Sequence, residues 1–396
     1  MKLKKTNLKV GDWVEVRSKD EILKTLDSKG ELNGMPFMPE MFAFCGKRFQ
    51  VYKRAHKTCD VVFPVRGRWV EQAVHLETRC DGQAHDGCQA GCLLFWKTAW
   101  LKAVDGSPPQ DSALRSGAQP EHPTGASSSA PGCTESDVLA RVRHADPKGG
   151  TPFYVCQATQ IPYATKDLDW WDIRQYVEDY RSGNVSLWQI FCGGVYFLYY
   201  TLCEAGIKLG RPMRWFYDKF HPVWRGTPYP QRRGTVPSGQ PTPSATLNLQ
   251  PGELVRVKSH QEILKTLNYS NRNRGLLWDA EEVPYCGGTY RVLRRVTKVI
   301  NEKVGKMYEM KSPCVILDSV VCQSRFSSCR MFCPRSIYPL WHEVWLERLG
   351  PDSPQAKAQE ANQAGDCPNP AASSPRADTD LSGRDAGVRD GRAPQR

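Results

Sequence analysis

The chain has 396 residues, of which 40% are hydrophobic and 10% aromatic, so it contains enough apolar material for two or three small cores. This composition excludes a chain that is disordered throughout. The formal net charge is +12 at pH 7, yet residues 350–396 hold six Lys or Arg and seven Asp or Glu. The positive charge therefore belongs to the rest of the chain, where it is compatible with nucleic acid, anionic lipid or an acidic protein as partner, or with solubility alone.

The chain contains fifteen cysteines, and their meaning depends on the compartment. The N-terminal stretch MKLKKTNLKVGDWVEV passes directly into a strand-like pattern without an apolar signal core, so we expect a cytoplasmic, reducing location. In such a compartment, clustered cysteines are typical of metal ligands rather than of disulfides.

The predicted elements begin with a β-rich segment over residues 8–103. Alternation of apolar and polar residues in Trp13–Val16 and in Phe49–Tyr52 predicts half-buried strands, and EILKTL at 21–26 predicts a short helix or turn. The aromatic stretch FWKTAWL at 95–101 ends the segment. Together these features predict a small SH3-like β-barrel closed by a helix that bears cysteines and the aromatic residues.

Residues 104–150 are rich in Gly, Ser, Pro and Ala and predict a disordered linker, and residues 151–225 predict a helical middle segment. Within it, DLDWWDIRQYVEDYRSG (167–183) has the composition of a helix that ends before a glycine. The apolar run Ile190–Cys203 is shorter than the roughly 20 residues needed to span a bilayer, so we expect a buried core helix. The alternative is peripheral membrane contact through residues 187–225, in which Lys208, Arg211, Arg214 and Lys219 meet phosphate headgroups.

A Pro-rich linker is expected over 226–248, and residues 249–349 then repeat the first segment. GDWVEVRSKDEILKTLD from Gly11 aligns with GELVRVKSHQEILKTLN from Gly252 at an offset of 241, and 16 of the 44 residues from 11 to 54 are identical at this offset. We therefore predict an α+β chain in which two SH3-like modules, each closed by a Cys-bearing helix, flank the helical middle segment. A disordered tail is expected over 350–396.

Three cysteines recur in both modules, spaced C-x7-C-x3-C in the first and C-x6-C-x3-C in the second: Cys80, Cys88, Cys92, Cys322, Cys329 and Cys333. A helix that begins near Cys88 would place Cys88 and Cys92 on one face, with both sulfurs about 2.3 Å from one ion. We predict that the fourth ligand is the further cysteine shared by both copies, Cys45 in the first and Cys286 in the second. Cys59, His85 and Cys314 are alternatives that occur in one copy only.

A single cysteine is more often a small buried hydrophobic residue than a ligand, and disulfides would need an oxidising compartment. Recurrence of three cysteines at nearly equal spacing, while most other residues differ, favours a metal ion or cluster. Four thiolates suit either zinc or iron–sulfur. We expect structural zinc, one ion per module, with an iron–sulfur cluster as the alternative.

The motifs GxSxG and HExxH, a P-loop and a Rossmann fingerprint are absent from the sequence. A nucleophilic Cys59 with His56 or His75 as its base stays open for the first module only, because the second module has no matching histidines. We expect no catalytic residues.

Three segments carry a resemblance to other proteins: GMPFMPEM (34–41), FCGKRFQVYKRAHKTCD (44–60) and CRMFCPRSIYPLWHEVWLERL (329–349). They resemble segments of bacterial proteins to which no activity is assigned, so the resemblance implies no function. We expect a non-catalytic binding or scaffold factor with a protein partner. The alternatives are an iron–sulfur redox or maturation protein, and a basic protein that binds nucleic acid or a membrane surface.

Overall fold

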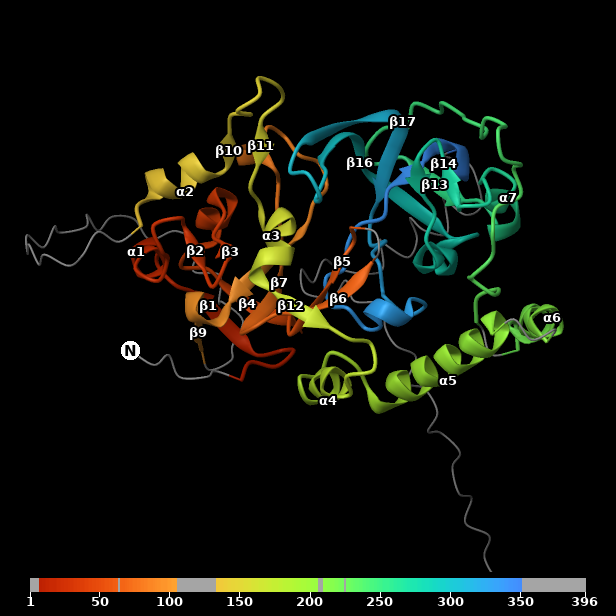
Figure 1. Cartoon of the computed structure of the whole chain (residues 1–396), viewed down its shortest axis with the longest axis horizontal. Coiled ribbons are helices and arrows are strands. Elements are labelled where there is room, and N and C mark those ends of the chain that lie inside the picture. The colour runs from red at the N-terminus through yellow and green to blue at the C-terminus, as the bar shows by residue number, and fades with distance from the viewer. Residues whose placement is uncertain (1–6, 63–64, 105–132, 206–208, 224–225, 351–396) are drawn as a thin grey trace, which may run out of the picture. The chain divides into compact units, whose positions relative to one another are not determined.

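The computed structural model describes residues 7–62, 65–104, 133–205, 209–223 and 226–350 (Figure 1). They belong to one compact unit, Met1–Gly350, and form a mixed α+β fold whose named strands all pair antiparallel. The prediction of an α+β chain is confirmed. The predicted tail from 351 onward and most of the predicted linker, residues 105–132, lie outside the described residues.

The first five-stranded sheet has the order β8-β7-β4-β1-β9. Its strands are β1 (Trp13–Val16), β4 (Arg48–Arg54), β7 (Ala73–Arg79), β8 (Leu93–Lys97) and β9 (Leu101–Ala103). Between β1 and β4 lie α1 (Lys19–Leu23), β2 (Glu31–Leu32), β3 (Met35–Pro36) and the 3-10 helix η1 (Pro39–Phe44). A hairpin of β5 (Lys57–Asp60) and β6 (Arg66–Trp69) projects between β4 and β7.

The second five-stranded sheet has the order β18-β17-β16-β13-β19, which matches the first sheet strand for strand along the chain. Its strands are β13 (Leu254–Val257), β16 (Thr289–Ile300), β17 (Met307–Leu317), β18 (Trp341–His342) and β19 (Leu346–Arg348). Between β13 and β16 lie α7 (His260–Leu264), β14 (Arg272–Asn273), β15 (Leu276–Leu277) and η4 (Ala280–Tyr285). Here β16 and β17 are long, and together they form the hairpin that β5 and β6 form in the first half.

The short helices begin at serine caps. Ser18 accepts the Glu21 N–H while the Glu21 carboxylate accepts the Ser18 N–H, and Ser259 and Glu262 repeat this capping box at α7. Each box satisfies two backbone donors that a helix start would otherwise leave without a partner. The predicted strands at Trp13–Val16 and Phe49–Tyr52 and the predicted short helix are therefore present.

Buried tryptophans fill both cores. Trp96 and Trp100 in the first half, and Trp341 and Trp345 in the second, are fully buried. Trp100 donates to Thr25 Oγ1 at 3.1 Å and Trp345 donates to Thr266 Oγ1 at 2.9 Å, so both indole N–H groups are satisfied. The aromatic stretch that was predicted as a closing helix is instead a strand, a one-turn 3-10 helix (η3, Thr98–Trp100; η6, Glu343–Trp345) and a strand. The helix prediction was wrong because the flanking strands bind this backbone as part of the sheet.

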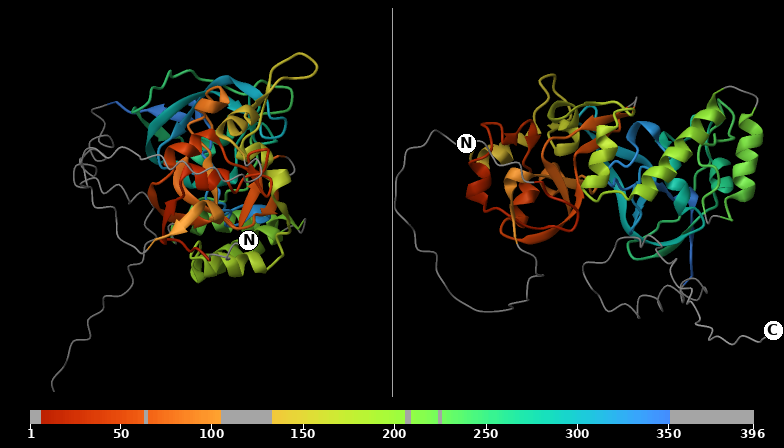
Figure 2. Two further views of the ribbon diagram at one scale, coloured as in Figure 1. Left: turned by 90° about the vertical axis from the view of Figure 1, so that its left-hand side faces the viewer. Right: turned by 90° about the horizontal axis from the view of Figure 1, so that it is seen from below.

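The described part of the predicted disordered linker, residues 133–150, contains α2 (Glu135–Arg141) and β10 (Arg143–His144), so the prediction of disorder is wrong there. The middle segment, 151–225, contains β11 (Phe153–Tyr154), α3 (Gln157–Ala164), β12 (Lys166–Leu168), α4 (Arg174–Arg181), α5 (Leu187–Glu204) and α6 (Gly210–Phe220). Strand β12 joins the β5–β6 hairpin, and α5 and α6 lie side by side (Figures 1 and 2). None of the helices within the described ranges is long and apolar enough to cross a membrane. The expectation that Ile190–Cys203 is a buried core helix is wrong, because only Gly193 and Cys203 of α5 are buried.

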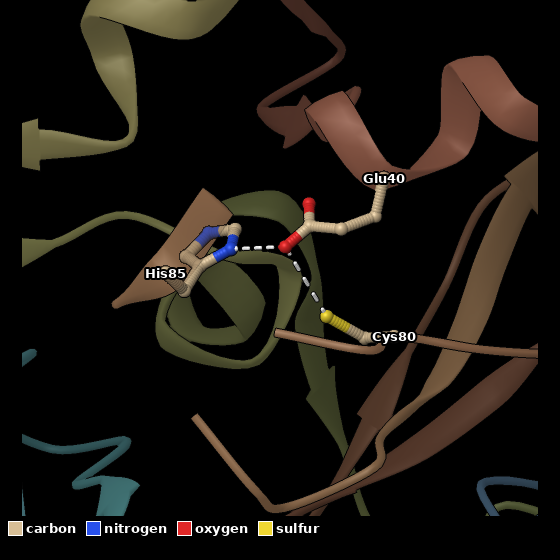
Figure 3. Close-up of side chains that lie close together, drawn as sticks. All are labelled: Glu40, Cys80 and His85. Atoms are coloured by element: carbon tan, nitrogen blue, oxygen red, sulfur yellow. Dashed lines mark hydrogen bonds and ion pairs between the residues drawn. The ribbon is translucent and has the colours of Figure 1, made fainter. Parts of the chain in front are cut away.

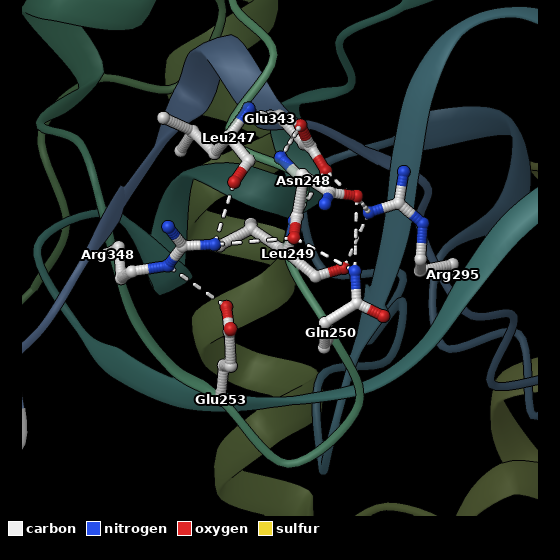
Figure 4. A network of polar contacts seen from close by, with 8 residues as sticks. All are labelled: Leu247, Asn248, Leu249, Gln250, Glu253, Arg295, Glu343 and Arg348. Carbon is white, nitrogen blue, oxygen red and sulfur yellow. Dashed lines mark hydrogen bonds and ion pairs between the residues drawn. The ribbon is translucent and has the colours of Figure 1, made fainter.

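The predicted Pro-rich linker at 226–248 has no regular elements, yet it is fastened to the second sheet. Glu343, whose side chain is 0% exposed, accepts the backbone N–H groups of Leu247, Asn248 and Leu249 at 2.6, 2.9 and 3.0 Å (Figure 4). Arg295 donates to the same carboxylate at 3.3 Å. Three backbone donors and one guanidinium compensate the buried charge.

Candidate metal centres

The two groups of three cysteines lie in equivalent loops of the two sheets. Cys80, Cys88 and Cys92 occupy the loop between β7 and β8, which contains the 3-10 turn η2 (Gln83–His85). Cys322, Cys329 and Cys333 occupy the loop between β17 and β18, which contains η5 (Ser328–Arg330). Each loop therefore gathers its three thiols at one edge of its sheet.

The helix predicted to begin near Cys88 is not formed. Gly82 has a φ of 73°, and a Cβ at this residue would lie 2.0 Å from the Cys88 carbonyl oxygen, so the loop folds back on itself where only glycine fits. The Cys80 N–H donates to the Cys92 carbonyl at 2.9 Å and closes the loop. The first and third cysteines are thus brought together by a turn rather than by helical spacing.

A fourth cysteine, Cys156, joins the first loop from the N-cap of α3. Burial raises the pKa of Cys92 to about 12, and negative charge on Cys156 and Cys88 adds to the effect. Burial also raises the pKa of Cys156 to about 11, to which charge on Cys88 contributes, and it raises the pKa of Cys80, to which charge on Cys92 and Cys156 contributes. The segment that carries Cys156 also contacts the first loop directly, since His85 Nε2 lies 3.1 Å from the carbonyl oxygen of Val155. We call Cys80, Cys88, Cys92 and Cys156 the first cluster.

The second loop likewise receives a fourth cysteine, Cys59, from β5. A hydrogen bond from the Cys333 thiol, helped by the charges of Arg335 and Arg330, lowers the pKa of Cys59 to about 6 against the effect of its burial. Burial, together with charge on Cys59, raises the pKa values of Cys322, Cys329 and Cys333. We call Cys59, Cys322, Cys329 and Cys333 the second cluster.

Each loop is also contacted by the hairpin of the other half of the chain. Cys59 reaches the second loop on the β5–β6 hairpin, and a Cβ at Gly67 of this hairpin would lie 3.0 Å from the Cys329 carbonyl oxygen. In return, the β16–β17 hairpin reaches the first loop, where the Ile300 N–H donates to Cys88 Sγ at 3.4 Å. Residue 300 is the position that the offset of 241 assigns to Cys59. The two hairpins therefore cross over at corresponding positions, with a thiol on one and an isoleucine on the other.

Buried charges lie beside the thiols. The Arg335 side chain, 3% exposed, donates to the Cys59 carbonyl at 3.1 Å and to Glu302 at 2.7 Å. Its charge acts on both Cys59 and Cys92, one thiol from each cluster. Arg330, also buried, is bonded to Asp279 and acts on Cys322 and Cys59. Cations in these positions stabilise thiolates, which are the form that binds metal.

Glu40, Cys80 and His85 form a compact group next to the first cluster (Figure 3). His85 Nδ1 lies 2.6 Å from Glu40 Oε1, and the Cys80 sulfur lies 3.6 Å from the same oxygen. Across the described ranges, this is the single group of three or more Cys, His, Asp or Glu side chains whose ligand atoms all lie within 4.8 Å of one another. Among these described residues, no three sulfurs of either cluster therefore lie within 4.8 Å of one another. Around a zinc ion with four Zn–S bonds of 2.3 Å, neighbouring sulfurs would lie roughly 4 Å apart.

Glu281, which the offset pairs with Glu40, clarifies the role of this carboxylate. Glu281 accepts the backbone N–H groups of Arg325 and Phe326 at 2.8 and 2.7 Å, between the first and second cysteines of the second loop. Glu40 bonds His85, between the first and second cysteines of the first loop. In both halves the shared glutamate is therefore hydrogen-bonded to the cysteine loop of its own half.

Cys45 and Cys286, predicted as the fourth ligands, lie in corresponding places at the C-terminal ends of η1 and η4 and pack against the hydrophobic cores. Burial raises the pKa of both thiols, and the charges that act on them are those of Lys19 and Glu282 respectively. The structure brings Cys156 and Cys59 to the loops instead. Cys314, the one-copy alternative in the second half, is buried in a separate cluster with Val296 and Ile316.

Cys59 was an alternative ligand for the first module in the sequence, whereas Cys156 carries no signal there that would link it to the loop cysteines. No local spacing marks Cys156, because the nearest cysteine of its cluster lies more than sixty residues away along the chain. Comparison of the chain with protein-family models, with curated proteins and with solved structures gives no match.

Proposed function

We propose that this chain is a metal-binding protein built from two copies of one SH3-like module, and that it acts as a non-catalytic binding factor. The common strand order of the two sheets and the 241-residue offset support the duplication. The observation that carries the metal assignment is the convergence of four cysteines at each loop. Three of them come from the loop and the fourth from a distant segment, and four cysteine ligands are typical of a structural zinc site.

The chemistry of the surroundings fits a bound dication. Four thiolates around one Zn²⁺ carry a net charge of about −2, which is costly to bury without compensation. Arg330 and Arg335 are buried next to the second cluster, where each is also paired with a carboxylate, Asp279 and Glu302 respectively. The charge of Arg335 also reaches Cys92 in the first cluster. Binding of one ion by all four thiols requires their sulfurs to move closer together, and changes of cysteine rotamer are the motion that this proposal invokes.

A ligand role explains Cys59 better than a catalytic one. Its pKa of about 6 would suit a nucleophile, but its side chain is 1% exposed and its hydrogen-bond partner is another cysteine. A catalytic thiol needs a path for its substrate, whereas a metal ligand needs a thiolate in a closed site. We therefore propose that Cys59 binds metal.

The proposed sites also connect the halves of the chain. The first would join the β7–β8 loop to α3, and the second would join the β17–β18 loop to β5. Since the free energy of metal binding is then part of the free energy of folding, the ions would hold the modules and the middle segment as one scaffold. We propose structural zinc, and an iron–sulfur cluster is the alternative.

Elemental analysis of protein purified without oxygen tests this proposal. The wild-type chain is expected to carry two equivalents of zinc and to show no absorption band near 400 nm. Cys88→Ser and Cys329→Ser should each remove one equivalent, whereas Cys45→Ser and the exposed Cys192→Ser should remove none. Wild-type protein without metal, or an equal loss of metal in all four variants, would overturn the metal assignment. A brown protein that contains iron and sulfide would show that the bound group is an iron–sulfur cluster and not zinc.

A further inference from the structure

Helices α4, α5 and α6 expose a large number of apolar side chains. Trp188, Phe191 and Leu198 are exposed on α5, with Trp188 70% exposed, Trp215 is 64% exposed on α6, and Ile173, the N-cap residue of α4, is 72% exposed. Trp188 and Phe191 stack on each other with ring centroids 5.5 Å apart. Monomeric proteins seldom expose a contiguous apolar surface of more than a few hundred Å² unless something binds there. We call the exposed side of these three helices the aromatic face.

The opposite side of α5 is firmly packed, so the aromatic face is held in place. A Cβ at Gly193 would lie 2.6 Å from the Phe332 ring, which means that α5 approaches the second cysteine loop as closely as glycine allows. Tyr196 of α5 packs edge to face on Phe326 of the same loop at 5.0 Å. The Tyr199 hydroxyl donates to the Met213 carbonyl of α6. The loop and the two helices therefore present the face as a fixed surface.

The four carboxylates within α4, α5 and α6 are paired with cations: Glu178 with Arg54, Glu204 with Arg214, Asp218 with Arg232 and, in the interior, Asp179 with Lys57. Two further acidic residues precede α4, of which Asp172 is bonded to Arg174 and Asp169 is exposed. Arg181, Arg211 and Lys219 are exposed on α4 and α6, and the structure gives them no carboxylate partner within the described residues. The surface is thus apolar, aromatic and positively charged, which is complementary to an anionic lipid interface.

We propose that the aromatic face binds the surface of a membrane that contains anionic phospholipids. Tryptophan and phenylalanine side chains enter the boundary between headgroups and acyl chains, where amphipathic rings are favoured. Arg181, Arg211 and Lys219 contact the phosphate groups. The helices lie in the interface rather than across it, since no helix of the described segments is long and apolar enough to span. A second copy of the chain would bring the same exposed cations to the contact, where like charges repel, and this favours an anionic lipid surface as the occupant.

Vesicle sedimentation with the full metal-loaded chain tests this inference. The wild-type protein is expected to pellet with vesicles of phosphatidylcholine and phosphatidylserine, about tenfold less with phosphatidylcholine alone, and less as salt rises. Trp188→Ser combined with Phe191→Ser, and separately Arg211→Glu combined with Lys219→Glu, should each weaken binding at least tenfold. Lys29→Glu combined with Lys311→Glu reverses two exposed cations outside the face and should change binding less than twofold.

Circular dichroism and metal content of every variant are measured in the same experiment, so that a failure of the metal proposal is seen separately. Binding to lipid is overturned if the wild-type chain stays in the supernatant at low salt. It is also overturned if the control pair weakens binding as much as the α6 pair, because net charge alone would then explain retention. A lipid-free dimer that Trp188→Ser with Phe191→Ser converts to a monomer would show that a second copy covers the face.

Discussion

Replacing Lys57 by methionine should destabilise the protein strongly, because the substitution strands a buried charge. Lys57 Nζ lies 2.6 Å from Asp179 Oδ2, 2.7 Å from the Met331 carbonyl and 3.2 Å from Gln175 Oε1. The two charged side chains are 3% and 0% exposed. Methionine keeps the aliphatic stem but removes the cation. Removal of one partner from a buried ion pair costs about 3–5 kcal/mol, and we expect a loss of this size in the free energy of unfolding.

The double variant Lys57→Met with Asp179→Leu should recover most of this loss, because both charges are then replaced by apolar groups of similar volume. Burial raises the pKa of Asp179 to about 6 even beside the lysine. Without the cation the carboxyl group holds its proton to a higher pH, so the cost of Lys57→Met should be smaller at pH 5 than at pH 8.

Urea unfolding followed by tryptophan fluorescence, on protein whose metal content has been measured, gives these free energies. Lys166→Met is the matched control, since Lys166 forms a 2.6 Å ion pair with Glu71 while 75% exposed, and such a surface pair contributes less than about 1 kcal/mol. If Lys57→Met costs no more than this control, or if the double variant is as unstable as Lys57→Met alone, the pair does not act as the geometry indicates.

Two further predictions concern other buried polar groups. Burial lowers the pKa of the fully buried His75 to about 3, so the unfolded chain binds an extra proton between about pH 3 and 6.5, and stability falls as the pH falls through this window. In urea unfolding, the loss of stability between pH 7 and pH 5 should be about 2 kcal/mol smaller for His75→Phe than for the wild type. An unchanged loss would contradict a neutral buried imidazole. Glu343→Gln should cost about 2 kcal/mol and speed amide hydrogen exchange at residues 247–249, because the charged acceptor of three backbone donors is lost. Glu347→Gln, at a half-buried glutamate paired with Arg256, serves as the control, and equal exchange in both variants would show that Glu343 does not hold this segment.

The parts of the fold that depend on local pattern were predictable. Strands β1 and β4 and the short helices α1 and α7 follow from alternation and from serine caps with a glutamate three residues on. The prediction of a helix at Cys88 was wrong because cysteines four residues apart can also lie in a turn. The glycines of this loop indicate a turn, and Gly82, Gly87 and Gly91 all have positive φ. Only contacts distant in the chain decide the remaining features.

The apolar run of α5 shows the same limit. Hydrophobicity alone suggested burial, but burial needs a partner surface, and α5 finds one only on the side of Gly193 and Tyr196. The fourth ligands were assigned to Cys45 and Cys286 on the assumption that duplicated sites use duplicated residues. This assignment stays a prediction. At the crossing hairpins, the two positions that the offset of 241 pairs carry Cys59 and Ile300, so a cysteine ligand there would not be duplicated.

This difference between the hairpins leads to a prediction about the origin of the ligands. Ile300 lies beside Cys88 in the first cluster, at the residue that the offset of 241 pairs with Cys59 of the second cluster, and it is 8% exposed. If the first site uses Cys156 because position 300 has no thiol, then Cys156→Ser should reduce the chain to one equivalent of zinc. Ile300→Cys in the Cys156→Ser background should restore the second equivalent, because it supplies a thiolate from the corresponding hairpin position.

The matched control is Val299→Cys in the same Cys156→Ser background, since the preceding residue of β16 points to the opposite face of the hairpin. Elemental analysis of the three variants gives the metal content. Cobalt substitution adds a second readout, because thiolate-to-cobalt absorption reports a tetrahedral sulfur site independently of total metal. Restoration by Ile300→Cys and not by Val299→Cys would mean that the two sites are variants of one crossed arrangement. If both substitutions restore the second zinc equivalent, or if neither does, the use of Cys156 does not depend on the residue at position 300. The resemblance between the hairpins then does not extend to the ligands.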